Sequence, residues 1–199
     1  MELSSQAVSP RARARRFAAR VIEFTALPFL CLCGALLLLN LAGFQIVYTP
    51  SVPVGLYHRH RIDQFYEPKL GEYVCIEGWR AEAPALFRAT VAAGIVPRDW
   101  GRDEPLVKRV AGLPGDVVTY VDEPGGRGHI EVNGRQLPAS ERLEHDGNGA
   151  RLPRPSYPFA LARDEVWLMS DHPRGFDSRY YGPVRRAALG CSTKLLWAW

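Results

Sequence analysis

Lysine is scarce in this sequence of 199 residues, because only three of its 25 lysine and arginine residues are lysines. A lysine with a chemical role must therefore be Lys69, Lys108 or Lys194. There is also no internal repeat, which excludes solenoids and repeat arrays. There are only four cysteines, and Cys75 and Cys191 do not stand at metal-ligand spacing. What remains is one ordinary domain plus an appendage.

The stretch from Phe24 to Tyr48 has no charged residue at all. At a rise of about 1.5 Å per residue, roughly 20 such residues cross a hydrocarbon core. A cleaved secretory signal peptide is the alternative, but its apolar part would be about 7–15 residues long. The sequence therefore predicts a cytoplasmic basic arm over residues 1–23, a transmembrane helix over 24–48 and an exported domain over 49–199.

The formal net charge of +4 is concentrated in the N-terminal arm. Before Phe24, five arginines stand against two glutamates, whereas from Ser51 onward 20 basic residues nearly balance 19 acidic ones. Basic patches are what nucleic-acid-binding domains present to phosphates. The main domain is nearly neutral, so no nucleic-acid partner is expected.

The cysteines divide by location. Cys31 and Cys33 lie inside the apolar run, where they serve as small apolar side chains. Cys75 and Cys191 lie in the exported part, where an oxidising compartment allows a disulfide. The sequence leaves that pairing open, because it does not show how far apart the two residues are.

The pattern after the apolar run is typical of strands, with one soluble helix expected over 81–94. The strongest turn signal is Asn133-Gly134, which predicts a hairpin over 130–137. Further strands are expected over 72–76, 105–110, 117–121, 165–169 and from 184 onward, with a surface loop over 138–158. The predicted fold class is mainly β, with one inserted helix and a single N-terminal transmembrane helix.

Ser51 lies on a stiffened segment directly after the apolar run, YTPSVPVGLY. Pro50 restricts the residue before it, Pro53 restricts Val52, and Gly55 permits a close backbone approach. A serine hydroxyl needs a base to become a nucleophile. An isolated surface serine near a membrane is the ordinary interpretation of this segment.

Lysine is the better candidate for that base than histidine. None of the five histidines, which are His58, His60, His129, His145 and His172, stands in a signature such as G-x-S-x-G, and Ser51 lacks that elbow. Strand alternation in LVKRV puts Lys108 on one face with Leu106 and Val110 and turns Arg109 away. Apolar neighbours remove hydration from an ammonium and lower its pKa. An ordinary strand lysine with an exposed head is the alternative.

The segment SDHPRGFDSRYYG, residues 170–182, gathers acids, arginines and a histidine near one turn. A buried ion-pair support and a solvated loop are both compatible with it. Asp171, His172 and Asp177 could bind a metal, but no second cluster completes such a site. We therefore expect neither a metal nor a cofactor.

Four segments together resemble bacterial signal peptidase I: TPSVPVGLY, LGEYVCI, VKRVAGLPGD and FDSRYYGPV, in this order behind an N-terminal span. The boxes KRVAGLPGD and DSRYYG are the most specific of these. The form SVPVGLY is most similar to the conjugative-transfer (TraF-type) maturation peptidases. The resemblance covers roughly Thr49 to Val184.

The resemblance implies a role for each matching residue. Ser51 matches the nucleophile and Lys108 the general base of a Ser-Lys dyad. Thr49 and the Ser51 N–H match the oxyanion hole. Structural support around the site is implied for Arg109, Asp177, Ser178 and Arg179.

Two departures from the housekeeping pattern stand out. Gly175 replaces a serine that orients the lysine in that pattern, and His172-Pro173 replaces part of the run G-D-N-R. Another group must then orient Lys108. Ser178 is one candidate, and the sequence does not decide.

The function implied is a serine-type signal peptidase that cleaves signal sequences from exported precursors, among them pilin or other conjugative-transfer and type IV secretion components. The implied partners are the precursor, the lipid bilayer and a conjugation or pilus apparatus. The implied location is the bacterial inner membrane, with the catalytic domain periplasmic. A transpeptidase that cyclises pilin with the same dyad and a non-catalytic anchored peptide-binding domain stay open as alternatives.

Overall fold

The structure is a computed structural model that describes residues 11, 15, 17, 20–63, 65–76, 84–95, 106–124 and 128–199. The chain divides into two compact units, Met1–Phe44 and Gln45–Trp199. Most of the basic arm expected over residues 1–23, and residues 81–83 of the expected soluble helix, lie outside the described residues.

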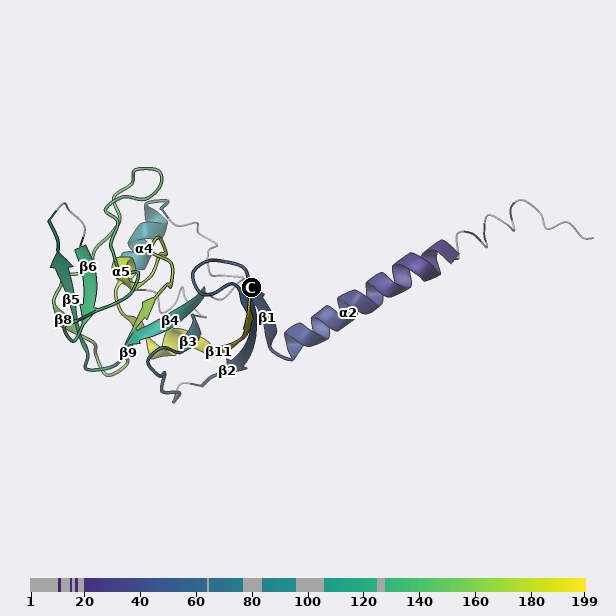
Figure 1. The fold of residues 1–199 in the computed structure, drawn as a ribbon, viewed down its shortest axis with the longest axis horizontal. Coiled ribbons are helices and arrows are strands. Elements are labelled where there is room, and N and C mark those ends of the chain that lie inside the picture. The colour runs from purple at the N-terminus through teal and green to yellow at the C-terminus, as the bar shows by residue number, and fades with distance from the viewer. Residues whose placement is uncertain are drawn as a thin grey trace, which may run out of the picture. The chain divides into compact units, whose positions relative to one another are not determined.

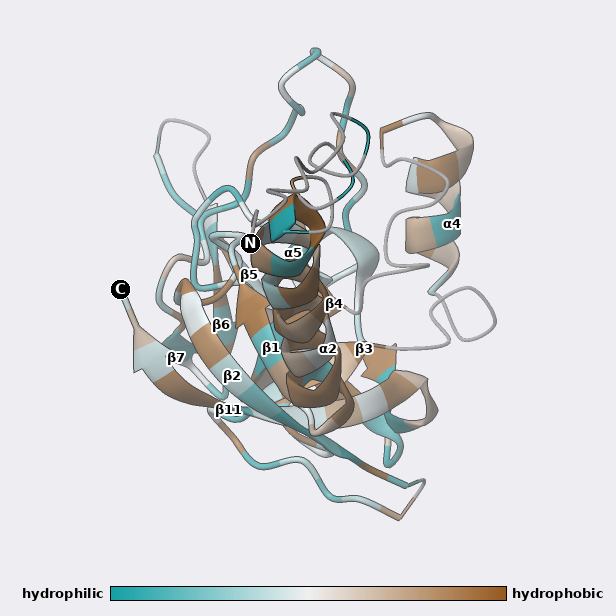
Figure 2. Ribbon diagram, turned by 90° about the vertical axis from the view of Figure 1, so that its right-hand side faces the viewer, coloured by the Kyte–Doolittle hydropathy of each residue, from teal (hydrophilic) through white to brown (hydrophobic). Residues whose placement is uncertain are grey.

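The first unit contains a helix in which a π-helical stretch, η1 (Ile22–Ala26), is followed by α2 (Leu27–Leu41). Arg20 and Val21, directly before η1, are also helical. The 20 residues Ile22–Leu41 are long and apolar enough to cross a membrane. Figure 2 shows hydrophobic residues along the length of α2. An apolar helix of this length near the N-terminus is consistent with a membrane anchor.

The uncharged run that ends at Tyr48 is divided between two kinds of structure. The helix ends at Leu41, Gly43 takes a positive φ of 92°, and Phe44–Val47 forms strand β1. A left-handed backbone is open to glycine without steric cost, so Gly43 allows the chain to turn out of the helix there. The last part of the run thus belongs to a sheet.

The second unit is built on a seven-stranded sheet with the order β1-β2-β11-β3-β4-β9-β10 (Figure 1). Its strands after β1 are β2 (Gly55–Arg61), β3 (Tyr73–Ile76), β4 (Leu106–Gly112), β9 (Glu165–Met169), β10 (Val184–Arg185) and β11 (Leu189–Ala198). The pairs from β2 across to β10 are antiparallel. The C-terminal strand β11 therefore lies between β2 and β3.

A second, four-stranded sheet has the order β7-β6-β5-β8. Its strands are β5 (Val117–Asp122), β6 (Gly128–Val132), β7 (Arg135–Gln136) and β8 (Phe159–Ala160). The hairpin expected around Asn133-Gly134 is confirmed, because β6 pairs with β7 and both turn residues have positive φ, 52° and 75°. Figure 1 shows this sheet on the far side of the unit from β1 and β2.

Short helices complete the unit: α4 (Ala85–Ala92), α5 (Ser178–Tyr181) and the 3-10 turn η2 (Arg186–Ala188). Phe87 of α4 and Tyr181 of α5 pack with Val74, Val110 and Leu168 of the large sheet. A second cluster around Trp167 and Ile130 joins the two sheets. The mainly β fold class expected from the sequence is confirmed.

Two expected elements differ in extent. The helix begins at Ala85, with Pro84 as its N-cap, because a proline lacks the N–H that a helix interior requires. The closing strand expected from Val184 onward is β10, then η2, then the long β11.

The pairing of Cys75 with Cys191 is settled by the register of two strands. The residues lie opposite each other on β3 and β11, with Cα atoms 4.9 Å apart, and they form a disulfide. Both are fully buried. The bond ties the C-terminal strand to β3, which in turn pairs with β4.

Candidate active site

Lys108 lies in the middle of β4 and is only 1% exposed. The expected alternation is confirmed, since Leu106 and Val110 pack in one hydrophobic cluster and Val107 in another. The alternative of a strand lysine with an exposed head is wrong for this residue, because the whole side chain is enclosed.

Burial lowers the pKa of Lys108 from 10.5 to about 8. The cause is lost hydration of the ammonium, which the Asp177 carboxylate opposes and the Arg179 guanidinium reinforces. The Asp171 carboxylate also favours the charged form. A lysine with this pKa is neutral in an appreciable fraction of molecules near neutral pH and can accept a proton.

The amine of Lys108 is held by Ser170, not by Ser178. Lys108 Nζ donates a hydrogen bond to Ser170 Oγ over 2.9 Å. Ser178 Oγ instead accepts from the backbone N–H of Leu168 over 3.0 Å, so it supports strand β9. The strand register explains this contact. Arg109 of β4 pairs with Met169 of β9 in antiparallel fashion, so Lys108 lies opposite Ser170, the residue that follows β9.

Asp177 and Arg179 form a fully buried ion pair beside this contact. Arg179 Nε donates to Asp177 Oδ1 over 2.8 Å, and a second guanidinium nitrogen donates to Oδ2 over 2.8 Å. Asp177 Oδ2 also accepts from the backbone N–H of Ser170 over 2.9 Å. The pair therefore holds the main chain of the residue that contacts Lys108.

Ser51 lies on the segment between β1 and β2 and is half-buried. Its carbonyl oxygen accepts a hydrogen bond from the backbone N–H of Asp171 over 2.7 Å. The segment is held further by Tyr57, whose hydroxyl donates to the Pro53 carbonyl over 2.7 Å. Thr49, two residues earlier, is exposed.

Asp171 is itself anchored on both carboxylate oxygens. Arg109 Nε donates to Oδ1 over 2.5 Å, and the Tyr73 hydroxyl donates to Oδ2 over 2.8 Å. Ser170 and Asp171 are consecutive, so one dipeptide holds the Lys108 amine through one residue and the Ser51 main chain through the other. The structure thereby brings Ser51, Lys108, Arg109, Asp177 and Arg179 to one locality.

The metal interpretation of Asp171, His172 and Asp177 finds no support. Both carboxylates are paired with arginines, and His172 Nδ1 accepts from the backbone N–H of Arg174 over 3.1 Å. Within the described part of the chain, no group of three or more His, Cys, Asp or Glu side chains could hold a metal ion.

Sequence reasoning missed Ser170 as a contact of Lys108 and Asp171 as an anchor of the Ser51 segment. A signal existed for the first: pairing of the predicted strands 105–110 and 165–169 would bring the residue after the second strand, Ser170, close to Lys108. The strand order was not available from the sequence, so this pairing was not assigned.

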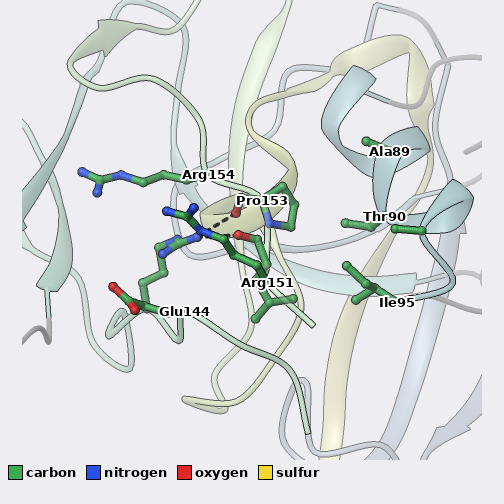
Figure 3. Close-up of a pocket in the computed structure, with 10 residues that line it drawn as sticks. Ala89, Thr90, Ile95, Glu144, Arg151, Pro153 and Arg154 are labelled. Carbon is green, nitrogen blue, oxygen red and sulfur yellow. Dashed lines mark hydrogen bonds between the residues drawn. The ribbon is translucent and has the colours of Figure 1, made fainter. Parts of the chain in front are cut away.

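A pocket of about 440 Å³ lies elsewhere, between α4 and the segment 142–154. Figure 3 shows Thr90 and Ile95 on one side of it and Glu144, Arg151 and Arg154 on the other. The buried Arg142 donates to the carbonyl oxygens of residues 152 and 153 there. None of the residues around Lys108 lines this pocket.

Residues 23–199 match the sequence profile of a family described as "Signal peptidase, peptidase S26". This chain belongs to that family. The resemblance to the signal peptidase I family that the four segments carried is therefore confirmed.

The chain is also similar to proteins named for plasmid and conjugal transfer. The chain is 35% identical over 169 residues to a plasmid transfer protein TraF of Escherichia coli, covering 78% of this chain and 86% of the relative. It is 33% identical over 150 residues to a conjugal transfer protein TraF of Agrobacterium tumefaciens (strain 15955), covering 74% and 78%. A solved signal peptidase I from Enterococcus faecalis V583 matches with a TM-score of 0.31 and 17% identity, over 62% of this chain and 94% of that one.

Proposed function

We propose that this S26 protein is a membrane-anchored serine endopeptidase in which Ser51 is the nucleophile and Lys108 the general base. The observation that carries the proposal is the buried Lys108, whose pKa is lowered to about 8 and whose amine is hydrogen-bonded to Ser170. Asp171, the next residue, holds the main chain of Ser51. An ordinary structural lysine would keep its ammonium in water.

The reaction is acyl transfer in two steps. Neutral Lys108 takes the proton of Ser51 Oγ as that oxygen attacks the scissile carbonyl, and the Thr49 hydroxyl and the Ser51 N–H stabilise the oxyanion. The protonated lysine then gives its proton to the leaving amine, which breaks the peptide bond. Lys108 then takes a proton from water, which attacks the ester carbonyl; the bond from that carbon to Ser51 Oγ breaks, and the lysine returns the proton to Oγ, which restores the hydroxyl. This dyad chemistry uses only groups of the chain itself.

The anchor is the apolar helix Ile22–Leu41. Ser51 follows the last helical residue, Leu41, by ten positions. Ten extended residues span at most about 35 Å, so the nucleophile stays close to the bilayer in which the helix ends. A precursor whose apolar signal sequence is still in the bilayer is the substrate best presented to such a site.

The orientation follows from charge and from redox chemistry. The arginine-rich arm before the helix favours a cytoplasmic N-terminus. The Cys75–Cys191 disulfide suits an oxidising compartment such as the periplasm. The relatives named for plasmid and conjugal transfer extend the proposal to the substrate: an exported component of a conjugation apparatus.

The test is precursor processing by the full-length protein in membranes, with a co-expressed exported precursor of the same transfer system. Ser51→Ala and Lys108→Met should each abolish processing, while Ser156→Ala and Lys194→Met, at exposed positions, should process normally. Normal processing by either dyad variant would refute the assignment. The mass of the mature product distinguishes hydrolysis from cyclisation, because a cyclic product has one water less.

A further inference from the structure

We propose that Ser170 is the positioning residue of Lys108, and that position 175 is glycine because the Ser170 side chain occupies the space that a side chain there would need. The inference rests on the proposed dyad and adds to it the group that orients the amine of Lys108. It also accounts for Gly175, the departure from the housekeeping pattern that the sequence left unexplained.

The position of Ser170 is fixed by burial and by two hydrogen bonds. The residue is fully buried, its N–H donates to Asp177 Oδ2 over 2.9 Å, and its Oγ accepts from Lys108 Nζ over 2.9 Å. A neutral lysine amine has two N–H bonds and one lone pair. When one N–H points at Ser170, rotation about the terminal carbon–nitrogen bond is restricted, and the lone pair can be held in one direction.

A hydroxyl suits this task better than a carboxylate. A carboxylate at the same distance would stabilise the ammonium strongly and raise the pKa of Lys108. The carboxylates of Asp177 and Asp171 already favour the charged form, against the effect of burial. Ser170 offers one hydrogen bond and no net charge, so it stabilises the ammonium far less than a carboxylate would.

Gly175 lies against the Ser170 side chain. A Cβ placed on Gly175 would overlap Cβ and Oγ of Ser170 and would also crowd the His172 carbonyl oxygen, at 3.1 Å. The main chain is held at both positions. Gly175 N–H donates to the His172 carbonyl and its carbonyl accepts from the Arg179 guanidinium, while Ser170 N–H donates to Asp177. Positions 170 and 175 therefore share one side-chain volume, and only one of them can fill it.

The first experiment is steady-state cleavage of a signal-sequence peptide by the full-length protein in detergent micelles. Ser170→Ala should lower kcat on the order of 10- to 100-fold with KM unchanged. Removing an acceptor from the amine also lowers the lysine pKa, so the pH profile should move to lower pH while kcat falls. A residue that merely supported the fold would not shift that profile. A kcat within threefold of wild type would overturn the proposal.

The second experiment exchanges the two residues. Gly175→Ser alone should lower kcat, because its side chain competes with Ser170 for one space. The double variant Ser170→Gly with Gly175→Ser returns one hydroxyl to that space and should recover most of the lost kcat. Failure of the double variant to exceed Ser170→Ala, with its melting temperature unchanged, would contradict the shared volume.

The third measurement does not depend on cleavage. The chain has three lysines, so selective 13Cε labelling of lysine gives three NMR signals, and Lys108→Met identifies one of them. Ser170→Ala should change the titration midpoint of that signal and leave those of Lys69 and Lys194 unchanged. An unchanged Lys108 titration refutes the positioning role even if the dyad is active. If the wild-type protein cleaves nothing but this signal responds, the proposed function fails and the contact stands.

Discussion

Arg179–Asp177 and Arg109–Asp171 are ion pairs of the same chemistry in different surroundings. The first is fully buried, and Arg179 donates further to the carbonyl oxygens of Ala139, Glu141 and Pro173. The second leaves its side chains 19% and 27% exposed, at the surface where Tyr73 joins it. In the buried pair, Asp177 accepts the N–H of Ser170. The half-buried pair contains the next residue, Asp171, whose own N–H donates to the Ser51 carbonyl.

The difference in burial predicts different roles: one ion pair stabilises the fold, and the other positions Ser51. A buried charge that loses its partner keeps the whole cost of its desolvation, so the buried pair Arg179–Asp177, the inner pair, is needed for the fold around Lys108. A partly exposed charge that loses its partner is compensated by water. The half-buried pair Arg109–Asp171, the outer pair, therefore contributes little to stability and acts on the position of the segment that carries Ser51.

The largest effect should come from breaking the inner pair. Arg179→Ala leaves Asp177 buried without its partner and several carbonyl oxygens without a donor, which should lower the free energy of unfolding by about 3–5 kcal/mol. Thermal unfolding of the full-length protein in micelles measures this. The control is Arg185→Ala, whose pairing with Asp164 is exposed and 3.8 Å long, and whose effect should stay within about 0.5 kcal/mol. Equal effects of the two variants would contradict the comparison.

A smaller effect on stability, with a clear effect on rate, should follow from weakening the outer pair. Asp171→Asn keeps the shape of the side chain and removes the charge that Arg109 binds. Stability should fall by less than about 1 kcal/mol, while kcat should fall on the order of 10-fold, because residue 171, whose N–H binds the Ser51 carbonyl, is no longer held by the charge of Arg109. Parallel melting curves and cleavage kinetics measure both. A loss of folding comparable to that of Arg179→Ala would show that burial does not separate the two pairs.

The smallest effect is a shift in pH dependence. Only neutral Lys108 can accept the Ser51 proton, so kcat/KM should rise with pH and level off above about pH 8, the lowered pKa of Lys108. The Asp171 carboxylate raises that pKa, so Asp171→Asn should lower it and move the rising limb to lower pH. A limb that moves to higher pH, or stays in place, would contradict the electrostatic role of the outer pair.

Much of the fold was accessible to local patterns. The strand over 165–169 and the hairpin at Asn133-Gly134 were predicted as the structure has them, because alternation and turn chemistry are local properties. The division of the apolar run was not predicted, since a short apolar segment such as 44–47 reads equally as helix or strand. Its strand state depends on the neighbouring sheet.

In the candidate site too, some residues were found from local sequence and others depend on strand pairing. Ser51 and Lys108 were identified from stiff backbone, lysine scarcity and the resemblance to the family boxes. Ser170 and Asp171 were missed as supports, because their roles require β9 to lie beside β4 in one register. That pairing joins residues about 60 positions apart, and local sequence carries no information about such a partner.

The sequence by itself determined the apolar N-terminal segment, the mainly β character and the two residues proposed for the dyad, because composition, alternation and proline stiffness act within a few residues. Only the tertiary structure decided that Cys75 meets Cys191, that β11 enters the sheet between β2 and β3, and that Ser170 contacts Lys108. Each of these depends on the register between distant strands. The same packing removes water from Lys108 and lowers its pKa to about 8, which is the property that turns an ordinary strand lysine into a candidate base.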